Sequence, residues 1–486
     1  MTHSFLWHDY ETFGTDPRRA RPAQFAAIRT DADLNAIGQP IVLYCRPPED
    51  ALPDPQSCFI TGITPQLCEA KGLSEAEFAR RIAAELCAAG TIGVGYNSMR
   101  FDSEVTRFLF WRNLREPYAQ EHHNGCGRWD VLDALRCARA LRPVGITWPT
   151  APDGTPSLRL EHMSAANGLV HTQAHDALSD VRATIEVARL LRRAQPRLFD
   201  FCLALRSKKR AAAELHLPEA LERGSQRAFL HISGMFGDAR GCLAVMAPLA
   251  LHPHKRREVI AWDLSADPSE LEHITPEEVR LRLFTRTEAL PAGVQRLAIK
   301  NVHLNRAPVV ISNTKTLDAQ QAAHWGIDMQ AVRQHFARLC ALPDLSALWQ
   351  AVYAPQEHDA PPDVDEALYA GFISDEDRRR LNRLLTLTPE EVALERCGFD
   401  DARLGELVFR WRARNWSHTL SDDEQARWKA HCAARILEGA GGTLGLQEYQ
   451  ERLDSIVEAS DDDERTMEIA DALSEWGERM GSRFSE

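Results

Sequence analysis

Two carboxylates stand close together near the start of the chain. Asp9 and Glu11 lie two residues apart in the segment Ser4–Thr12, whose aromatic and apolar residues predict a β-strand. Because side chains alternate along a strand, both carboxylates point to the same face. Such a pair is costly unless a cation sits between its members, and hard divalent cations such as Mg²⁺ prefer oxygen ligands. Alone, the pair is compatible with either a metal site or a solvated strand face.

A third acidic residue, Asp102, follows the segment Gly95–Phe101 and opens a predicted helix. One interpretation is an N-cap, because aspartate accepts hydrogen bonds from the first free backbone N–H groups of a helix. The other is that Asp102 joins Asp9 and Glu11 at a metal site. Both interpretations stay open from the sequence.

The segment from His175 to Asp180 also carries candidate catalytic residues, and it lies at the start of a helix predicted from its apolar periodicity. Asp180 falls in the first turns and could face the strand that carries Asp9 and Glu11. His175 precedes the helix, and its ordinary pKa of about 6.5 suits a general base that activates water. A surface or capping histidine is the alternative interpretation.

Strands and helices must bring these residues together. Apolar runs predict strands at 4–12, 24–30, 40–45 and 91–96, and helical periodicity predicts helices at 74–89, 103–115, 130–141 and 176–194. This order of elements predicts a mixed α/β domain.

The 486 residues are enough for about three domains. We expect them at 1–196, at 197–352 with short strands such as 228–233, 259–264 and 308–312, and at 353–486 with a helical pattern from 364 onward. Net charge differs along the chain: −2 for residues 1–196, +4 for 197–350 and −15 for 351–486. Nucleic acid, if bound, is therefore expected to contact the first two segments.

Composition excludes several classes of protein. With 44% hydrophobic and 26% charged residues, the bulk of the chain is not expected to be disordered. There is no apolar run of 18 or more residues, so no membrane span is expected, and the first residues lack the pattern of a secretory signal. The 11 cysteines include no Cys-x-x-Cys spacing, so neither a zinc site nor a redox motif is indicated. Reduced thiols in a cytoplasm are the simplest interpretation.

Taken together, the acidic residues and the histidine resemble a known catalytic set. An Asp-x-Glu pair on a first strand, an aspartate about ninety residues on, and a histidine five residues before a last aspartate resemble the DEDD exonuclease superfamily in its histidine subclass. The tyrosine subclass has tyrosine four residues before the last aspartate, where this chain has Asp176.

Further segments resemble one family of this superfamily, exonuclease I, the bacterial single-strand DNA 3′→5′ exonuclease. The similar segments are His8–Gly14, Arg21–Thr30, Ile60–Pro65, Gly95–Asn97, Phe101–Asp102, Arg128–Asp130, Leu160–His162, Ala174–Ala177, His231–Gly237, Ala247–Ala250, Leu368–Phe372 and Arg412–Asn415.

The resemblance implies an RNase H-like exonuclease domain, then an SH3-like β-containing domain and a C-terminal all-helical domain. It implies two Mg²⁺ ions, with Mn²⁺ as a possible substitute, anchored by Asp9, Glu11 and Asp180. Asp102 would complete the set directly or through water, and His175 would take the proton from the attacking water. The products would be 5′-mononucleotides released from the 3′ end.

Residues that would contact single-stranded DNA are also implied by the resemblance. Arginine suits phosphate through its planar fork, and a tyrosine ring stacks on bases. His122 departs from the family pattern, because the family often has an aromatic residue there, so contacts from the loop around it are not assigned. The implied contacts are Arg107, Tyr118, Arg136, Arg159, Lys208 and Lys300.

In this family, the acidic C-terminal tail of single-strand DNA-binding protein docks on the exonuclease. The +4 segment could supply the basic pocket. We expect a cytoplasmic monomer, with no membrane partner, that acts in DNA repair and recombination. Two alternatives remain: an RNA-trimming exonuclease, disfavoured by the second and third domains, and a single-strand binding or scaffold protein with a relic site.

Overall fold

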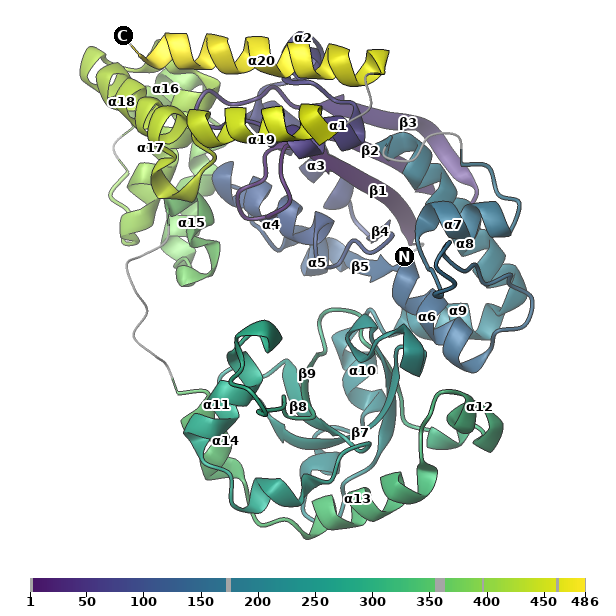
Figure 1. The fold of residues 1–486 in the computed structure, drawn as a ribbon. Helices are drawn as coiled ribbons and strands as arrows, with labels where there is room; N and C mark the ends of the chain where they lie inside the picture. Colours follow the sequence, from purple (N-terminus) through teal and green to yellow (C-terminus); the bar gives the residue numbers. More distant parts are fainter. Residues whose placement is uncertain (1–2, 172–175, 355–362, 396, 460–462, 486) are drawn as a thin grey trace. The chain divides into compact units, whose positions relative to one another are not determined.

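The computed structural model describes residues 3–171, 176–354, 363–395, 397–459 and 463–485 (Figure 1). The chain divides into two compact units. Unit 1 comprises Met1–Gly127, His171–Ile185 and His358–Glu486, and unit 2 comprises Arg128–Val170 and Glu186–Glu357. Because each unit combines separate stretches of chain, this division differs in kind from the consecutive bounds 1–196, 197–352 and 353–486, which stay a prediction.

Unit 1 contains a mixed sheet in which β3, β2, β1 and β4 lie side by side in that order. β1 (Ser4–Thr12) pairs antiparallel with β2 (Pro22–Thr30), β2 pairs antiparallel with β3 (Ala36–Tyr44), and β1 runs parallel to β4 (Thr91–Gly95). Along β1, Tyr10 is buried, whereas Asp9 and Glu11 are half-buried. The two carboxylates therefore share one face of the sheet, as their spacing predicts.

The opposite face of β1 belongs to the core of unit 1. Tyr10 packs there with Phe25 of β2 and with apolar side chains of two helices, among them Phe78 of α3 and Leu109 of α4. The helices of this part of unit 1 are α1 (Pro55–Thr61), α2 (Pro65–Lys71), α3 (Glu75–Leu86), α4 (Asp102–Arg112) and α5 (Ala119–His122).

The predicted helices of the first 196 residues exist, with shifted ends. Three of them correspond to α3, α4 and α6 (Val131–Leu141), and the fourth to α8 (Ala177–Ala194), which passes from unit 1 into unit 2. The strand expected at 40–45 begins earlier, at Ala36, and β5 (Gly127–Asp130) had no expected counterpart. Helix α4 starts one residue before the expected 103, so Asp102 belongs to the helix.

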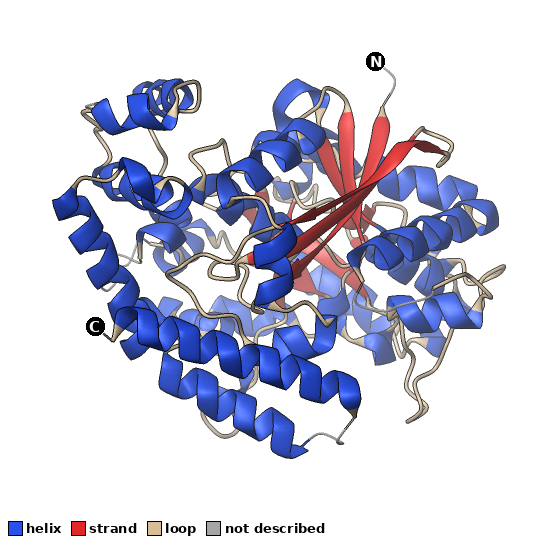
Figure 2. Cartoon of the chain, turned by 90° about the horizontal axis from the view of Figure 1, so that it is seen from above, coloured by secondary structure: helices blue, strands red, loops and turns tan. Residues whose placement is uncertain are grey.

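The C-terminal stretch of unit 1 is helical, and the structure assigns no strand to its described residues from 363 onward. α19 and α20 run side by side (Figures 1 and 2). Its elements are the 3₁₀ segment η8 (Val364–Ala370), α15 (Asp375–Leu384), α16 (Pro389–Leu394), α17 (Ala402–Asn415), α18 (Asp422–Glu438), α19 (Leu446–Ala459) and α20 (Glu464–Phe484).

A buried ionic network joins this helical stretch to the sheet-containing part of unit 1. Arg414 of α17 lies 2.6 Å from a carboxylate oxygen of Asp50 and also pairs with Asp365. Arg21, which directly precedes β2, lies 3.0 Å from Asp365. All four side chains are at most 5% exposed, and their mutual attraction lowers the pKa of Asp50 and of Asp365 against the effect of burial.

Unit 2 contains a second sheet, in the order β10-β6-β7-β8-β9, whose neighbouring strands are all antiparallel. Apolar side chains of α10 and of the strands form its core. The expected strand runs are confirmed as β6 (Phe229–Ile232), β8 (Glu258–Asp263) and β10 (Val309–Ile311), and β7 (Leu243–Leu251) and β9 (Ile299–His303) complete the sheet. The other helices of unit 2 are α7 (Leu160–Ala166), α9 (Pro196–Ala204), α10 (Lys208–Glu214), α11 (Pro276–Phe284), α12 (Ala319–His324), α13 (Met329–Ala341) and α14 (Ser346–Val352).

Among the described residues, no helix combines the length and the apolar character needed to cross a membrane.

The buried network makes Arg414 a stability determinant. Replacing it by methionine (Arg414→Met) leaves Asp50 and Asp365 without their closest cation in a buried site, which typically costs about 3–5 kcal/mol. We expect a clear fall in the urea midpoint of unfolding. The control is Arg18→Met, because Arg18 is 57% exposed and its ion pair with Asp16 lies at the surface, so about 0–1 kcal/mol is expected. Equal midpoints for the two variants would contradict this account.

Candidate active site

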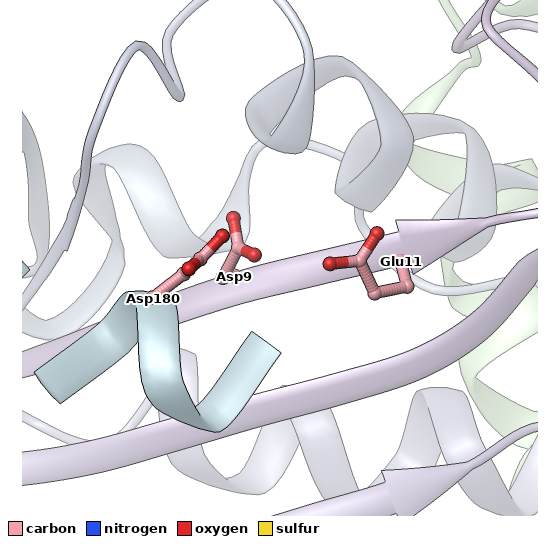
Figure 3. A group of neighbouring side chains, drawn as sticks. All are labelled: Asp9, Glu11 and Asp180. Atoms are coloured by element: carbon pink, nitrogen blue, oxygen red, sulfur yellow. The ribbon is translucent and has the colours of Figure 1, made fainter. Parts of the chain in front are cut away.

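Three carboxylates from two elements converge in unit 1. Asp9 and Glu11 of β1 and Asp180 of α8 each offer one carboxylate oxygen, and these oxygens lie within 4.8 Å of one another. In Figure 3, Asp180 extends from α8 toward Asp9, and Glu11 lies further along β1 with its carboxylate directed back toward them. The structure thus brings together the residues that the sequence predicts as metal ligands.

Asp102 joins this group from the first turn of α4. One oxygen of its carboxylate, Oδ1, accepts a hydrogen bond of 3.2 Å from the backbone N–H of Tyr10, between the two carboxylates of β1. The N-cap position belongs to Phe101, and no side-chain cap is present. The N-cap interpretation of Asp102 is therefore wrong, because the carboxylate is used to hold the helix against β1.

The carboxylates repel one another strongly. Burial, together with the charges of Asp102, Glu11 and Asp180, raises the pKa of Asp9 well above its ordinary range. Burial and the charges of Asp180, Asp102 and Asp176 raise the pKa of Glu11 to about 8. Groups that resist ionisation in this way are stabilised when a cation enters between them. The oxygen-only donor set fits a hard divalent cation.

The turn between β4 and α4 places Asp102. A Cβ on Gly95 would lie 2.5 Å from Cβ of Ser98 and 3.2 Å from the carbonyl oxygen of His8, so only glycine allows this close approach at the end of β4. Two residues later, Asn97 has a φ of 61°, a left-handed conformation that asparagine tolerates better than most residues. This tight turn starts α4 directly beside β1.

A histidine that the sequence did not single out contacts the cluster. Nε2 of His171 lies 2.6 Å from Oδ1 of Asp180, and the His171 side chain is 6% exposed. A buried hydrogen bond of this kind fixes the orientation of a carboxylate that ligates a metal. No spacing rule links a histidine to an aspartate nine residues later, so only the fold shows the contact. His175, the predicted general base, lies outside the described residues.

Two of the predicted DNA contacts lie in unit 1. Arg107 of α4 is buried, pairs with Glu104 at 2.5 Å and Glu121 at 2.6 Å, and lies over the ring of Tyr118, 5.1 Å from its centroid. Tyr118 is half-buried beneath that guanidinium. The Nε and Nη1 atoms of Arg107 are thus already engaged by these two carboxylates. His122 ends α5 in the same part of the chain.

The other predicted contacts belong to unit 2. Arg136 on α6 pairs with Asp133 at 2.7 Å, and Arg159 directly precedes α7 and is 75% exposed. Lys208 is the first residue of α10 and is exposed. Nζ of Lys300 on β9 lies 5.6 Å from the centroid of the Phe236 ring. The contact role of all six residues stays a prediction.

A carboxylate cluster of this kind, from strand β1 and helix α8, is typical of metal-dependent nucleases. Consistent with that class, residues 6–188 match the exonuclease family model, residues 206–355 the exonuclease I SH3-like domain and residues 362–480 the exonuclease I C-terminal domain. The chain belongs to the exonuclease I family of exodeoxyribonucleases. The predicted fold class, with exonuclease, SH3-like and C-terminal helical domains, is thereby confirmed.

Relatives and solved structures agree over nearly the whole chain. Exodeoxyribonuclease I of Escherichia coli (strain K12) is 41% identical over 478 residues, 98% of both chains. The exonuclease I structure from Methylocaldum szegediense matches with a TM-score of 0.92 and 45% identity, covering 99% of this chain and 100% of the other. E. coli exonuclease I in complex with a dA16 oligonucleotide matches with a TM-score of 0.91 and 41% identity, covering 98% and 100%. Other matching structures are an ExoI/SSB-Ct complex and a zinc-bound E. coli ExoI–ssDNA complex.

The raised pKa of Glu11 makes the stability of the metal-free protein depend on pH. Its pKa is about 8 in the folded chain and 4.5 ordinarily, so between these values the folded chain holds a proton that the unfolded chain releases. Its contribution to stability is therefore full below about pH 4.5 and is lost as pH rises through about 8. In EDTA, we expect Glu11→Gln to raise the melting temperature by a few degrees at pH 8.5, and less at pH 5.5.

With divalent cation present, the unmodified protein should melt at a higher temperature than Glu11→Gln, because the unmodified cluster binds the ion more tightly. The matched control is Glu475→Gln on the exposed surface of α20, which should melt like the unmodified protein under all four conditions. A melting temperature of Glu11→Gln at or below that of the unmodified protein at pH 8.5 in EDTA would refute the repulsion argument.

The contact of His171 with Asp180 predicts an effect on cation affinity. His171→Ala frees the Asp180 carboxylate to rotate, and loss of such an orienting partner typically weakens metal affinity by about 10–100-fold. Calorimetric titration with Mn²⁺ measures this directly. His171→Gln keeps a hydrogen-bond donor and should recover part of the affinity. If His171→Ala binds Mn²⁺ as tightly as the unmodified protein, the histidine does not orient Asp180.

Proposed function

We propose that the chain is a Mg²⁺-dependent exonuclease that hydrolyses single-stranded DNA from the 3′ end to 5′-mononucleotides. The observation that carries the proposal is the cluster of Asp9, Glu11 and Asp180, whose oxygens lie within 4.8 Å of one another. The match to E. coli exonuclease I in complex with dA16 supports the single-stranded DNA substrate.

The cluster suits two divalent cations held by Asp9, Glu11 and Asp180. When bound, such ions stabilise the negative charge that develops on the attacking and leaving oxygens of a phosphodiester. Oxygen ligands favour Mg²⁺, with Mn²⁺ as a substitute, and a related ExoI–ssDNA structure holds zinc. The three ligands leave coordination positions for water and for DNA phosphate, because Mg²⁺ is seldom held by protein ligands alone.

The remaining residues either position the metal ligands or take up a proton. Asp102 accepts the backbone N–H of Tyr10, so it keeps the first turn of α4 beside Asp9 and Glu11. We assign to His175 the removal of a proton from the attacking water, because a neutral imidazole is the side chain best matched to that task near pH 7. His171 holds Asp180 in place.

The residues assigned to contact the strand come from each unit taken by itself. We assign phosphate contacts to Arg107, Arg136 and Arg159 and to the two lysines, Lys208 and Lys300. We assign base stacking to Tyr118, which is sequence-tolerant, as an exonuclease that advances along any strand requires. A phosphate at Arg107 would compete with Glu104 and Glu121, which pair with this guanidinium.

The partner and the setting of the enzyme follow from its family. A matching structure is an ExoI/SSB-Ct complex, and we propose that this chain likewise docks the acidic C-terminal tail of single-strand DNA-binding protein. The excess of basic residues over 197–350 supports a pocket for that tail in this segment. A monomeric enzyme of cytoplasmic DNA repair and recombination is the role that this combination favours.

The test uses DNA labelled at its 5′ end, single-stranded or duplex, with a matched RNA strand, in Mg²⁺. Single-stranded DNA should shorten from its 3′ end, while the duplex and the RNA resist. Asp180→Asn removes one negative ligand at nearly constant shape, and we expect the rate to fall roughly a thousand-fold or more because the cations lose an anchor.

Asp471→Asn, on the exposed surface of α20, is the matched control and should cut at the unmodified rate. Anisotropy with labelled DNA in EDTA separates catalysis from binding, since Asp180→Asn should still bind. If Asp180→Asn cuts as fast as the control, the carboxylate assignment fails. If the unmodified protein binds the strand and never shortens it, the chain is a binding protein with a relic site.

A further inference from the structure

The turn between β7 and β8 presents a run of exposed basic residues. His254, Lys255, Arg256 and Arg257 are consecutive and all exposed. The backbone N–H of Leu304 donates to the carbonyl of Arg257 at 2.8 Å, which ties this turn to the end of β9. None of the residues assigned above to catalysis or DNA contact lies in this turn.

A buried histidine holds the turn in one shape. Nδ1 of His252 accepts hydrogen bonds from the backbone N–H groups of His254 and Lys255, at 3.1 and 3.2 Å. His252 is 5% exposed, and burial lowers its pKa, so its ring stays neutral and able to accept at neutral pH. The cations therefore project from an ordered turn, which lowers the entropy cost of binding a ligand.

The charges of this turn are poorly matched by acidic groups. Lys255 lies 3.4 Å from Glu258, a buried carboxylate that is also 3.2 Å from Nδ1 of His303. Within the described parts of the chain, the guanidinium groups of Arg256 and Arg257 make no ion pair and no hydrogen bond. Some other exposed arginines of unit 2 do face a carboxylate, as Arg338 does with Asp267.

Aromatic surface adjoins the cations. The ring centroid of His252 lies 4.1 Å from that of Tyr353, and Tyr353 in turn lies 5.7 Å from Phe284, edge to face. Phe284 ends α11, which lies against α14 (Figure 1), and is 55% exposed. The turn thus adjoins a row of three rings whose last member is open to solvent.

Exposed cations beside an exposed aromatic ring are what a single-stranded nucleic acid binds. Phosphates pair with guanidinium and ammonium groups, and unstacked bases cover aromatic rings. A linear polyanion also matches charges carried by consecutive residues better than a single carboxylate does. An acidic peptide tail would pair with the cations but would not explain why the Phe284 ring beside them is exposed.

We propose that the β7–β8 turn with its adjoining ring (Lys255, Arg256, Arg257 and Phe284) is a further binding surface for single-stranded DNA on the SH3-like domain. This proposal rests on the proposed exonuclease function. It adds a contact for the part of the strand that has not reached the carboxylates. The surface lengthens the stretch of strand held at once, so its effect should appear only on strands long enough to reach it.

The test measures affinity by anisotropy in EDTA, with labelled oligothymidine of about 6 to about 30 nucleotides and over a range of salt concentrations. For Arg256→Ala/Arg257→Ala on the longest strands, loss of two phosphate contacts should flatten the slope of log affinity against log salt by about 1.4. The slope for the shortest strands should hardly change. Phe284→Ala should weaken only long-strand binding, by about ten-fold, with less change in the slope.

The matched control, Arg193→Ala/Arg197→Ala, removes the same charge from exposed positions at the end of α8 and the start of α9. It should keep the unmodified slope at every length. The proposal fails if the turn variant behaves like this control, if it loses affinity equally for all lengths, or if it loses only binding of the acidic SSB tail peptide. If the unmodified protein binds DNA in this length-dependent way but does not hydrolyse it, the proposed function fails while the surface stands.

Discussion

Electrostatic repulsion among Asp9, Glu11, Asp102 and Asp180 is the constraint on which the rest of unit 1 depends. Burial and these mutual charges raise the pKa of Asp9 and of Glu11, so holding the groups together destabilises the folded chain. Such strain persists only where the surrounding structure overdetermines the positions. Here β1 fixes two of the carboxylates by register, α8 supplies the third, and Asp102 is tied to β1 through the N–H of Tyr10.

The C-terminal stretch braces the helix that carries Asp102. Trp111 of α4 donates to the carbonyl of Val364 at 2.8 Å, and the hydroxyl of Tyr369 meets Glu104. At the far end of α4, Arg112 pairs with Glu75 in the buried network that includes Asp365 and Arg414. These contacts hold α4 along its length, so the helical stretch after residue 363 contributes to the geometry of the carboxylates although it supplies none of them.

The sequence predicts the parts of this site that follow from local spacing. Alternation along a strand is enough to place Asp9 and Glu11 on one face, and helical periodicity places Asp180 in the first turns of α8. It could not decide between a cap and a site residue for Asp102, because both roles put aspartate at the start of a helix. It missed the contact of His171 with Asp180, which depends on how the chain before α8 folds back and not on any period. Length and local pattern predicted three domains, and family resemblance supplied their fold types. The division into two units depends on long-range contacts that no local pattern encodes.

Net charge along the sequence also has to be interpreted after pairing. Residues 351–486 carry a charge of −15, which at first suggests a surface that repels DNA. One of these carboxylates, Asp365, is neutralised inside unit 1 by Arg21, which lies outside this stretch. Pairs such as Asp363 with Arg410 lie within the stretch, so its sum already includes them. In unit 2, Arg256 and Arg257 stay exposed at a turn, and the adjoining carboxylate, Glu258, already faces Lys255 and His303. A polyanion interacts with the exposed charges that have no ion-pair partner. A segment of modest net charge can therefore attract DNA more strongly than its net charge suggests.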